Sequence, residues 1–141
     1  MLVRGVTRTM KATSNRKADP MTVLPRVLVV EDSPAFRGLV AAHLQRLGAT
    51  FAVADDVPGA IEQLERSDFD LVLTDFHLPA ATGLDLLAFV RHRFPVLPVV
   101  VMSALVDSDL RRQAASADGL YDKQQLLGVL PELVHGAPVA A

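Results

Sequence analysis

No cysteine occurs in the 141 residues, so neither a disulfide framework nor a thiolate metal site is possible. This absence agrees with a reducing compartment, and we expect a cytoplasmic protein. Long hydrophobic runs are missing as well. The longest, residues 94–102, is interrupted by Pro95 and Pro98 and falls far short of the ~20 apolar residues that span a bilayer. We therefore expect no insertion into a membrane.

Lysine is scarce, and the basic residues divide the chain in two. Residues 1–25 hold five basic residues and one acid, a net charge of +4; since the whole chain carries −2, residues 26–141 carry −6. The first segment lacks apolar periodicity and cannot bury enough surface to offset its ordering entropy. We predict that residues 1–25 form a disordered basic tail, solvated rather than bound to nucleic acid, with residues 1–20 dispensable for folding.

The rest of the chain has the composition of one folded domain. Half of all residues are apolar, which is enough for a single domain with a hydrophobic core. We assign this domain to residues 26–135 and expect residues 136–141, which are mostly small, to be a short C-terminal tail. No DNA-binding or catalytic effector domain is expected after it, so the protein should act on a separate partner.

Apolar runs alternate with helical patterns along the domain. Strands are predicted at residues 27–30, around 51–53, and at 70–75, 96–102 and 119–122. A helical pattern follows each run; Ser33-Pro34 starts the first helix, Gly48 ends it, and Pro131 should bend the last. Five such units in strict alternation predict an α/β fold, with a doubly wound, five-stranded parallel sheet of strand order 2-1-3-4-5.

Polar residues stand where the predicted strands end. Glu31 and Asp32 close the first strand, Asp75 the third and Ser103 the fourth, and Lys123, the only lysine after residue 17, follows the fifth. The carboxyl ends of parallel strands meet at one edge of the sheet, where ligands bind in open α/β folds. We therefore expect these five residues to form one site. Taken alone, Asp75 could equally cap the helix that follows it.

Three carboxylates at one edge need a cation. Two unit charges about 4 Å apart repel by about 4 kcal/mol at an effective dielectric of 20. Oxygen ligands with room for water suit Mg²⁺, and Mg²⁺ together with Lys123 would balance three negative charges. Asp75 could then be approached by a phosphoryl group, whose oxygens need the metal, an ammonium and a hydroxyl such as that of Ser103. Asp75 is the predicted nucleophile, forming an aspartyl phosphate.

Residues 26–134 resemble the receiver domain of response regulators in bacterial two-component signalling, which has a flavodoxin-like fold. The matching features are an acidic pair, an aspartate followed by proline and glycine, a hydroxyl residue before alanine, and a lysine. These are Glu31-Asp32, Asp75 with Pro79 and Gly83, Ser103-Ala104, and Lys123. None is specific by itself, but all occur in order at strand ends across nearly the whole domain.

The resemblance implies a signalling module rather than an enzyme. Asp75 would take phosphate from a histidine kinase or a phosphotransfer protein, with Ser103 and Lys123 assisting. The backbone carbonyl of His77 would be a further Mg²⁺ ligand beside Glu31, Asp32 and Asp75. The downstream partner would be a separate protein, with no direct binding of nucleic acid.

Three departures from the family pattern concern how phosphorylation is relayed. Gln124 follows Lys123 where the family usually has proline, and the fourth helix is short. Leu120 stands three residues before the lysine, where the family usually has an aromatic residue, and strand alternation points Tyr121 to the opposite face. We therefore expect a modest conformational change, centred on the loops after the third and fourth strands.

Other functions fit the residues less well. An aspartate-nucleophile phosphatase needs a second acid two residues after Asp75, where His77 stands. A flavin or nucleotide binder needs a phosphate-binding loop after the first strand, where Glu31 and Asp32 would repel phosphate. One alternative stays open: a receiver-like module that binds a protein partner without being phosphorylated.

Overall fold

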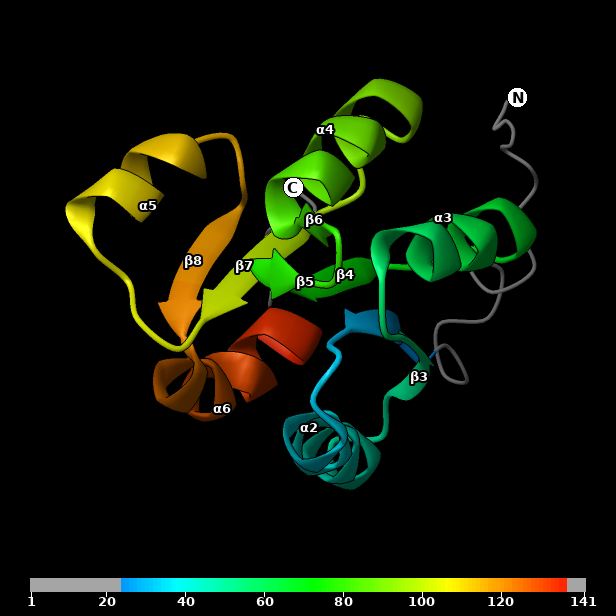
Figure 1. The fold of residues 1–141 in the computed structure, drawn as a ribbon. Coiled ribbons are helices and arrows are strands. Elements are labelled where there is room, and N and C mark those ends of the chain that lie inside the picture. Colours follow the sequence, from blue (N-terminus) through cyan, green and yellow to red (C-terminus); the bar gives the residue numbers. More distant parts are fainter. Residues whose placement is uncertain (1–23, 137–141) are drawn as a thin grey trace.

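The computed structural model describes residues 24–136, which form a parallel sheet with helices on both faces (Figure 1). The strands are β2 (Arg26–Val30), β3 (Thr50–Ala54), β4 (Leu71–Asp75), β7 (Val99–Ser103) and β8 (Gly119–Asp122). They pair in the order β3-β2-β4-β7-β8, all parallel. This order confirms the predicted 2-1-3-4-5 topology. The tails predicted at residues 1–25 and 136–141 lie almost entirely outside the described residues.

The helices alternate with the strands. They are α2 (Pro34–Arg46), α3 (Val57–Arg66), α4 (Gly83–Arg93), α5 (Ser108–Gln113) and α6 (Lys123–Pro131), and a short π-helix, η1 (Glu132–Gly136), follows α6. In Figure 1, α3 and α4 lie above the sheet and α2 and α6 below it, while α5 lies beside β8. Among residues 24–136, no helix is long and apolar enough to cross a membrane.

The sheet separates two hydrophobic cores. Alternate residues of β4 show the division: Val72 packs with the α3 and α4 side, whereas Leu71 and Leu73 pack with the α2 and α6 side. All three are buried. A strand covered on both faces shows a continuous apolar run instead of alternation, which is why β4 was recognisable from its sequence.

Side-chain caps set where the helices begin. The Ser33 hydroxyl accepts a hydrogen bond from the amide of Phe36 (3.4 Å) at the start of α2, as predicted. The carboxylate of Asp122 accepts one from the amide of Gln125 (2.8 Å), and the Gln125 side chain accepts one from the amide of Asp122 (3.1 Å). This capping box starts α6 at Lys123 without a proline.

The predicted start of the fourth strand was wrong. β7 begins at Val99 rather than Val96, and Val96 is 90% exposed. Pro95 and Pro98 have no amide hydrogen to give to a sheet. Residues 94–98 instead form a turn in which the amide of Leu97 donates to the carbonyl of Phe94 (3.0 Å).

A small hairpin that the sequence did not predict follows β4. β5 (His77–Leu78) pairs antiparallel with β6 (Ala81–Thr82) across the turn formed by Pro79 and Ala80. Ala80 has φ +62°, in the left-handed region that favours glycine. The hairpin holds the chain between Asp75 and α4 in a fixed path.

Candidate functional site

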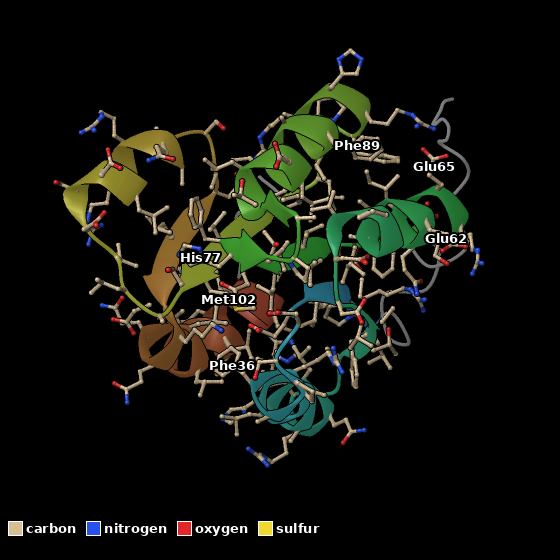
Figure 2. All side chains as sticks on the ribbon, viewed as in Figure 1. Phe36, Glu62, Glu65, His77, Phe89 and Met102 are labelled. Carbon is tan, nitrogen blue, oxygen red and sulfur yellow. The ribbon has the colours of Figure 1, made fainter. Side chains whose placement is uncertain are left out.

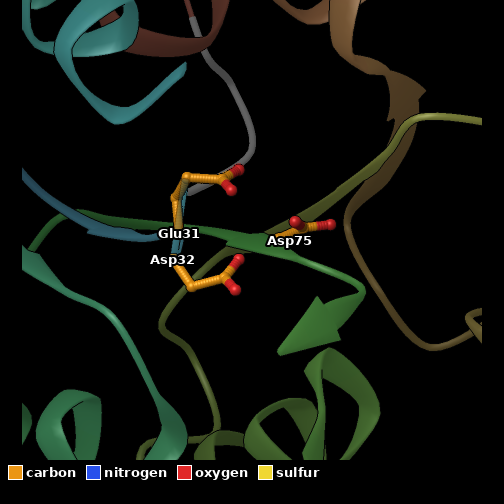
Figure 3. A group of neighbouring side chains, drawn as sticks. All are labelled: Glu31, Asp32 and Asp75. Carbon is orange, nitrogen blue, oxygen red and sulfur yellow. The ribbon is translucent and has the colours of Figure 1, made fainter. Parts of the chain in front are cut away.

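Three carboxylates converge at the carboxyl edge of the sheet (Figure 3). Glu31 and Asp32 follow β2, and Asp75 is the last residue of β4, the neighbouring strand. One oxygen from each lies within 4.8 Å of the others. The structure thus brings together the three acids that the strand ends predicted.

Lys123, the first residue of α6, joins two of these acids. Its Nζ lies 2.9 Å from Glu31 Oε1 and 3.2 Å from Asp75 Oδ2. It also lies 4.8 Å from the centre of the Phe36 ring, and Figure 2 shows Phe36 on the side of α2 that faces α6. Burial by itself lowers the pKa of Lys123, but its hydrogen bond to Glu31 and the charge of Asp75 outweigh burial, so this pKa lies above its usual value.

Glu31 is fully buried. Burial is the main reason that the pKa of Glu31 is raised, and the charge of Asp75 adds to the effect. Hydrogen bonds from Lys123 and from the amide of Ser33 (3.0 Å) oppose it without cancelling it. Glu31 therefore carries its negative charge at a cost, and a further cation at the site would reduce that cost.

The backbone around Asp75 is tightly packed. Its carboxylate Oδ1 accepts a hydrogen bond from the amide of His77 (3.2 Å), and the residue is 5% exposed. Gly83 lies directly against it, since a Cβ at Gly83 would be 2.5 Å from the carbonyl oxygen of Asp75. The amide of Gly83 also donates to the carbonyl of Phe76 (2.7 Å). A glycine is required here by close backbone approach.

Ser103 ends β7 at the same edge and is buried. Its hydroxyl donates to the carbonyl of Leu105 (3.0 Å) in the loop before α5. Among residues 24–136 it makes no hydrogen bond to Asp75. To reach a phosphoryl group on Asp75, the hydroxyl would have to leave Leu105.

His77 enters the site through its backbone. It lies in β5 beside the strand ends (Figure 2), and its exposed imidazole packs edge-on against the ring of Phe76, with 4.7 Å between ring centres. Its amide already binds Asp75. The assignment of its carbonyl as a metal ligand stays a prediction.

The two residues before Asp122 point to opposite faces of β8. Leu120 packs with the α3 and α4 core, and Tyr121 packs with the α2 and α6 core, as strand alternation predicted. The Tyr121 ring folds back over Gly119, where a Cβ would meet its Cε2 at 2.9 Å. The position of the usual aromatic residue is therefore taken by Leu120, and Tyr121 does not replace it.

Two residues near the site were not found from the sequence. Phe36 contacts Lys123, and Arg37 donates from Nη1 to the carbonyl of Glu31 (2.9 Å). Phe36 was predicted only as part of the apolar stripe of the first helix. Arg37 carries no motif that could have revealed a bond to a backbone atom six residues earlier.

The donor set fits a hard divalent cation. All three converging side chains offer carboxylate oxygens, the ligands that Mg²⁺ prefers, and the described residues place no histidine nitrogen in the cluster. Asp32 is exposed, so the water molecules that Mg²⁺ retains could enter from solvent. The single lysine leaves a surplus of negative charge that a divalent ion would balance.

Residues 27–123 match the family model of the response regulator receiver domain. The chemotaxis protein CheY of Pseudomonas aeruginosa is 37% identical over 115 residues, which are 78% of this chain and 93% of CheY. The response regulator protein PilR of the same organism is 39% identical over 115 residues, but these are only 26% of PilR. This chain therefore corresponds to about a quarter of that larger relative.

A solved structure carries the same fold. The response regulator protein TrrA of Thermotoga maritima, in complex with Mg²⁺ and BeF, matches with a TM-score of 0.73 and 26% identity. The match covers 81% of this chain and 99% of TrrA.

Proposed function

The chain belongs to the response regulator receiver domain family of two-component signalling, and we propose that residues 26–135 form a receiver phosphorylated on Asp75. The observation that carries this proposal is the cluster of Glu31, Asp32 and Asp75 within 4.8 Å, with Lys123 paired to two of them. The phosphoryl donor would be a histidine kinase or a phosphotransfer protein. A separate protein would read the phosphorylated state.

The proposed reaction is a phosphoryl transfer to a carboxylate. A carboxylate oxygen of Asp75 attacks phosphorus, the bond from phosphorus to the donor's histidine nitrogen breaks, and that nitrogen keeps the electron pair. Lys123, already 3.2 Å from Oδ2 of Asp75, would hold one phosphoryl oxygen, and the Ser103 hydroxyl would turn from Leu105 to bind another. Mg²⁺, when bound by Glu31, Asp32 and Asp75 with the His77 carbonyl, would neutralise charge on the transferred group.

Burial of the reacting side chains limits which molecules can reach Asp75. Asp75 and Ser103 are each at most 5% exposed, so only a small group can approach from the open side beside Asp32. The ammonium of Lys123, 3.2 Å from Oδ2 of Asp75, limits the repulsion that an incoming anionic phosphoryl group would meet. These features support an acceptor more than a module that only binds protein.

Acetyl phosphate tests the proposal without a kinase, because attack by Asp75 on its phosphorus releases acetate. With Mg²⁺ present, the full chain should gain the mass of one phosphoryl group, and Asp75→Asn should gain none. Asp55→Asn is the matched control, because Asp55 is an exposed carboxylate just after β3; it should be phosphorylated like the wild type. Equal phosphorylation of Asp75→Asn would refute the assignment. No phosphorylation of any variant would favour the alternative of a phosphorylation-independent module.

A further inference from the structure

Within the described residues, Asp32 is the one acid of the cluster whose carboxylate has no hydrogen-bond or ion-pair partner. It is exposed, and no group among residues 24–136 donates a hydrogen bond to its side chain. Glu31 and Asp75, by contrast, are both buried and paired with Lys123. An exposed, unpaired side chain has rotamer freedom that it must lose when it binds a cation. The position of Asp32 must therefore be set through its backbone.

The backbone of Asp32 is fixed on both sides. On the far side, the amide of Ser33 donates to Glu31 Oε2 (3.0 Å). On the near side, the peptide between Glu31 and Asp32 is fixed through its carbonyl, which accepts the hydrogen bond from Arg37 Nη1 (2.9 Å). Arg37 lies on the first turns of α2, so its guanidinium reaches back over the helix start to the strand end.

We propose that Arg37 is a positioning residue for the cation site: its hydrogen bond to the Glu31 carbonyl orients the peptide that carries Asp32 and so sets the affinity for Mg²⁺. The inference rests on the proposed function, because it takes the acid cluster as the Mg²⁺ site. A guanidinium is suited to this role, since its donors are fixed in a plane and it stays charged at any relevant pH.

An electrostatic role and a positioning role of Arg37 predict opposite changes in Mg²⁺ affinity when the guanidinium is removed. If the guanidinium acted only as a nearby positive charge, it would repel Mg²⁺, and its removal would tighten binding. If it orients Asp32, its removal weakens binding, because groups that orient metal ligands typically contribute about 10–100-fold in affinity. The direction of the change therefore separates the two roles.

The test is calorimetric titration of the full chain with Mg²⁺ alone. Arg37→Met, which keeps the length of the side chain but neither charge nor donor, should weaken Mg²⁺ binding about 10-fold. Arg37→Lys, which keeps the charge and can donate one hydrogen bond to the same carbonyl, should recover part of that loss. Arg46→Met removes an arginine from the other end of the same helix and should change the affinity less than about twofold. Unchanged or tighter binding by Arg37→Met would overturn the inference.

A second measurement on the metal-free protein separates failure of the inference from failure of the proposed function. NMR relaxation of the Asp32 backbone amide should show greater mobility in Arg37→Met than in wild type, with the Val30 amide unaffected as an internal control. If wild type binds no Mg²⁺, the metal part of the proposed function fails. The role of Arg37 is then decided by this mobility alone, and equal mobility in the two proteins would overturn it.

Discussion

The two edges of the sheet use the same kinds of residue in different ways. At the amino edge, Asp118 accepts hydrogen bonds from the amide of Val99 (2.7 Å) and from Arg91. Arg91 also donates to the carbonyls of Leu97 (2.9 Å) and Ser116 (3.1 Å). One acid and one base therefore tie the end of α4 to the beginnings of β7 and β8. Here charge is matched, and its role is structural.

At the carboxyl edge, charge is not matched. Glu31, Asp32 and Asp75 share the single ammonium of Lys123, and burial raises the pKa of Glu31. An edge with more carboxylates than cations is less stable than it could be, and proteins retain such arrangements mainly at functional sites. The comparison shows that the excess of acid, rather than its mere presence, distinguishes the site.

The largest expected effect is from Gly83→Ala, which would disturb the backbone under Asp75. The added Cβ would lie 2.5 Å from the Asp75 carbonyl oxygen and 3.2 Å from Cα of Phe76, and neither backbone atom can move cheaply. We expect a loss of more than about 3 kcal/mol in the free energy of unfolding, measured by urea denaturation.

Gly38→Ala is the matched control for Gly83→Ala. Gly38 lies inside α2 with nothing within 4 Å of the added Cβ, so this change should stabilise the protein by up to about 1 kcal/mol. If the two alanine variants had similar stabilities, the close packing beneath Asp75 would not matter.

Asp118→Ala and Asp32→Ala should show that the amino edge of the sheet contributes to folding stability and the carboxyl edge to Mg²⁺ binding. Asp118→Ala leaves the amide of Val99 without its acceptor and removes the ion pair with Arg91; it should cost about 1–3 kcal/mol of stability, with Mg²⁺ affinity unchanged. Asp32→Ala removes an exposed side chain and should change stability by less than about 0.5 kcal/mol, but weaken Mg²⁺ binding by at least about 10-fold. Denaturation and titration of both variants give the comparison. Loss of Mg²⁺ binding in Asp118→Ala would contradict it.

The smallest expected effect is a pH dependence caused by Glu31. Because burial raises its pKa in the folded state, folding favours the protonated form. Stability from this group is present below the pKa of the unfolded chain and is lost as the pH rises through the folded pKa. In EDTA, wild type should therefore lose stability relative to Glu31→Gln as the pH rises above the ordinary carboxyl pKa of about 4.5.

Thermal unfolding of both proteins across this pH range provides the measurement. Adding Mg²⁺ should reduce the difference, since a bound cation favours the ionised carboxylate. A difference that stays constant with pH would show that Lys123 already compensates the burial of Glu31.

The sequence predicted the fold well where a single physical rule decides the outcome. Residues 71–73 are apolar without interruption because β4 is covered on both faces, and the acid that ends it therefore had to lie at the sheet edge. The apolar run through Val96 does not start a strand, because Pro95 and Pro98 on either side of it have no amide hydrogen to give to a sheet. The β5–β6 hairpin has strands of two residues, too short for any periodicity to show.

The strand ends predicted the acids, the serine and the lysine of the site, but not the contacts that residues of α2 make with them. Strand order placed Glu31, Asp75 and Lys123 together, since parallel strands end at one edge. The bond from Arg37 to a backbone carbonyl and the contact of Phe36 with Lys123 depend on side-chain directions that spacing does not encode. The hydroxyl direction of Ser103 likewise depends on the loop around Leu105.

The ring of Tyr121, which folds over Gly119, is an intrinsic fluorescent probe of β8. The chain contains one tyrosine and no tryptophan, so its tyrosine absorption and fluorescence come from a single side chain on β8. That strand ends one residue before Lys123, whose Nζ lies 3.2 Å from Asp75 Oδ2. Any change in how β8 packs on the α2 and α6 side should therefore alter the emission of an unlabelled, unmodified chain.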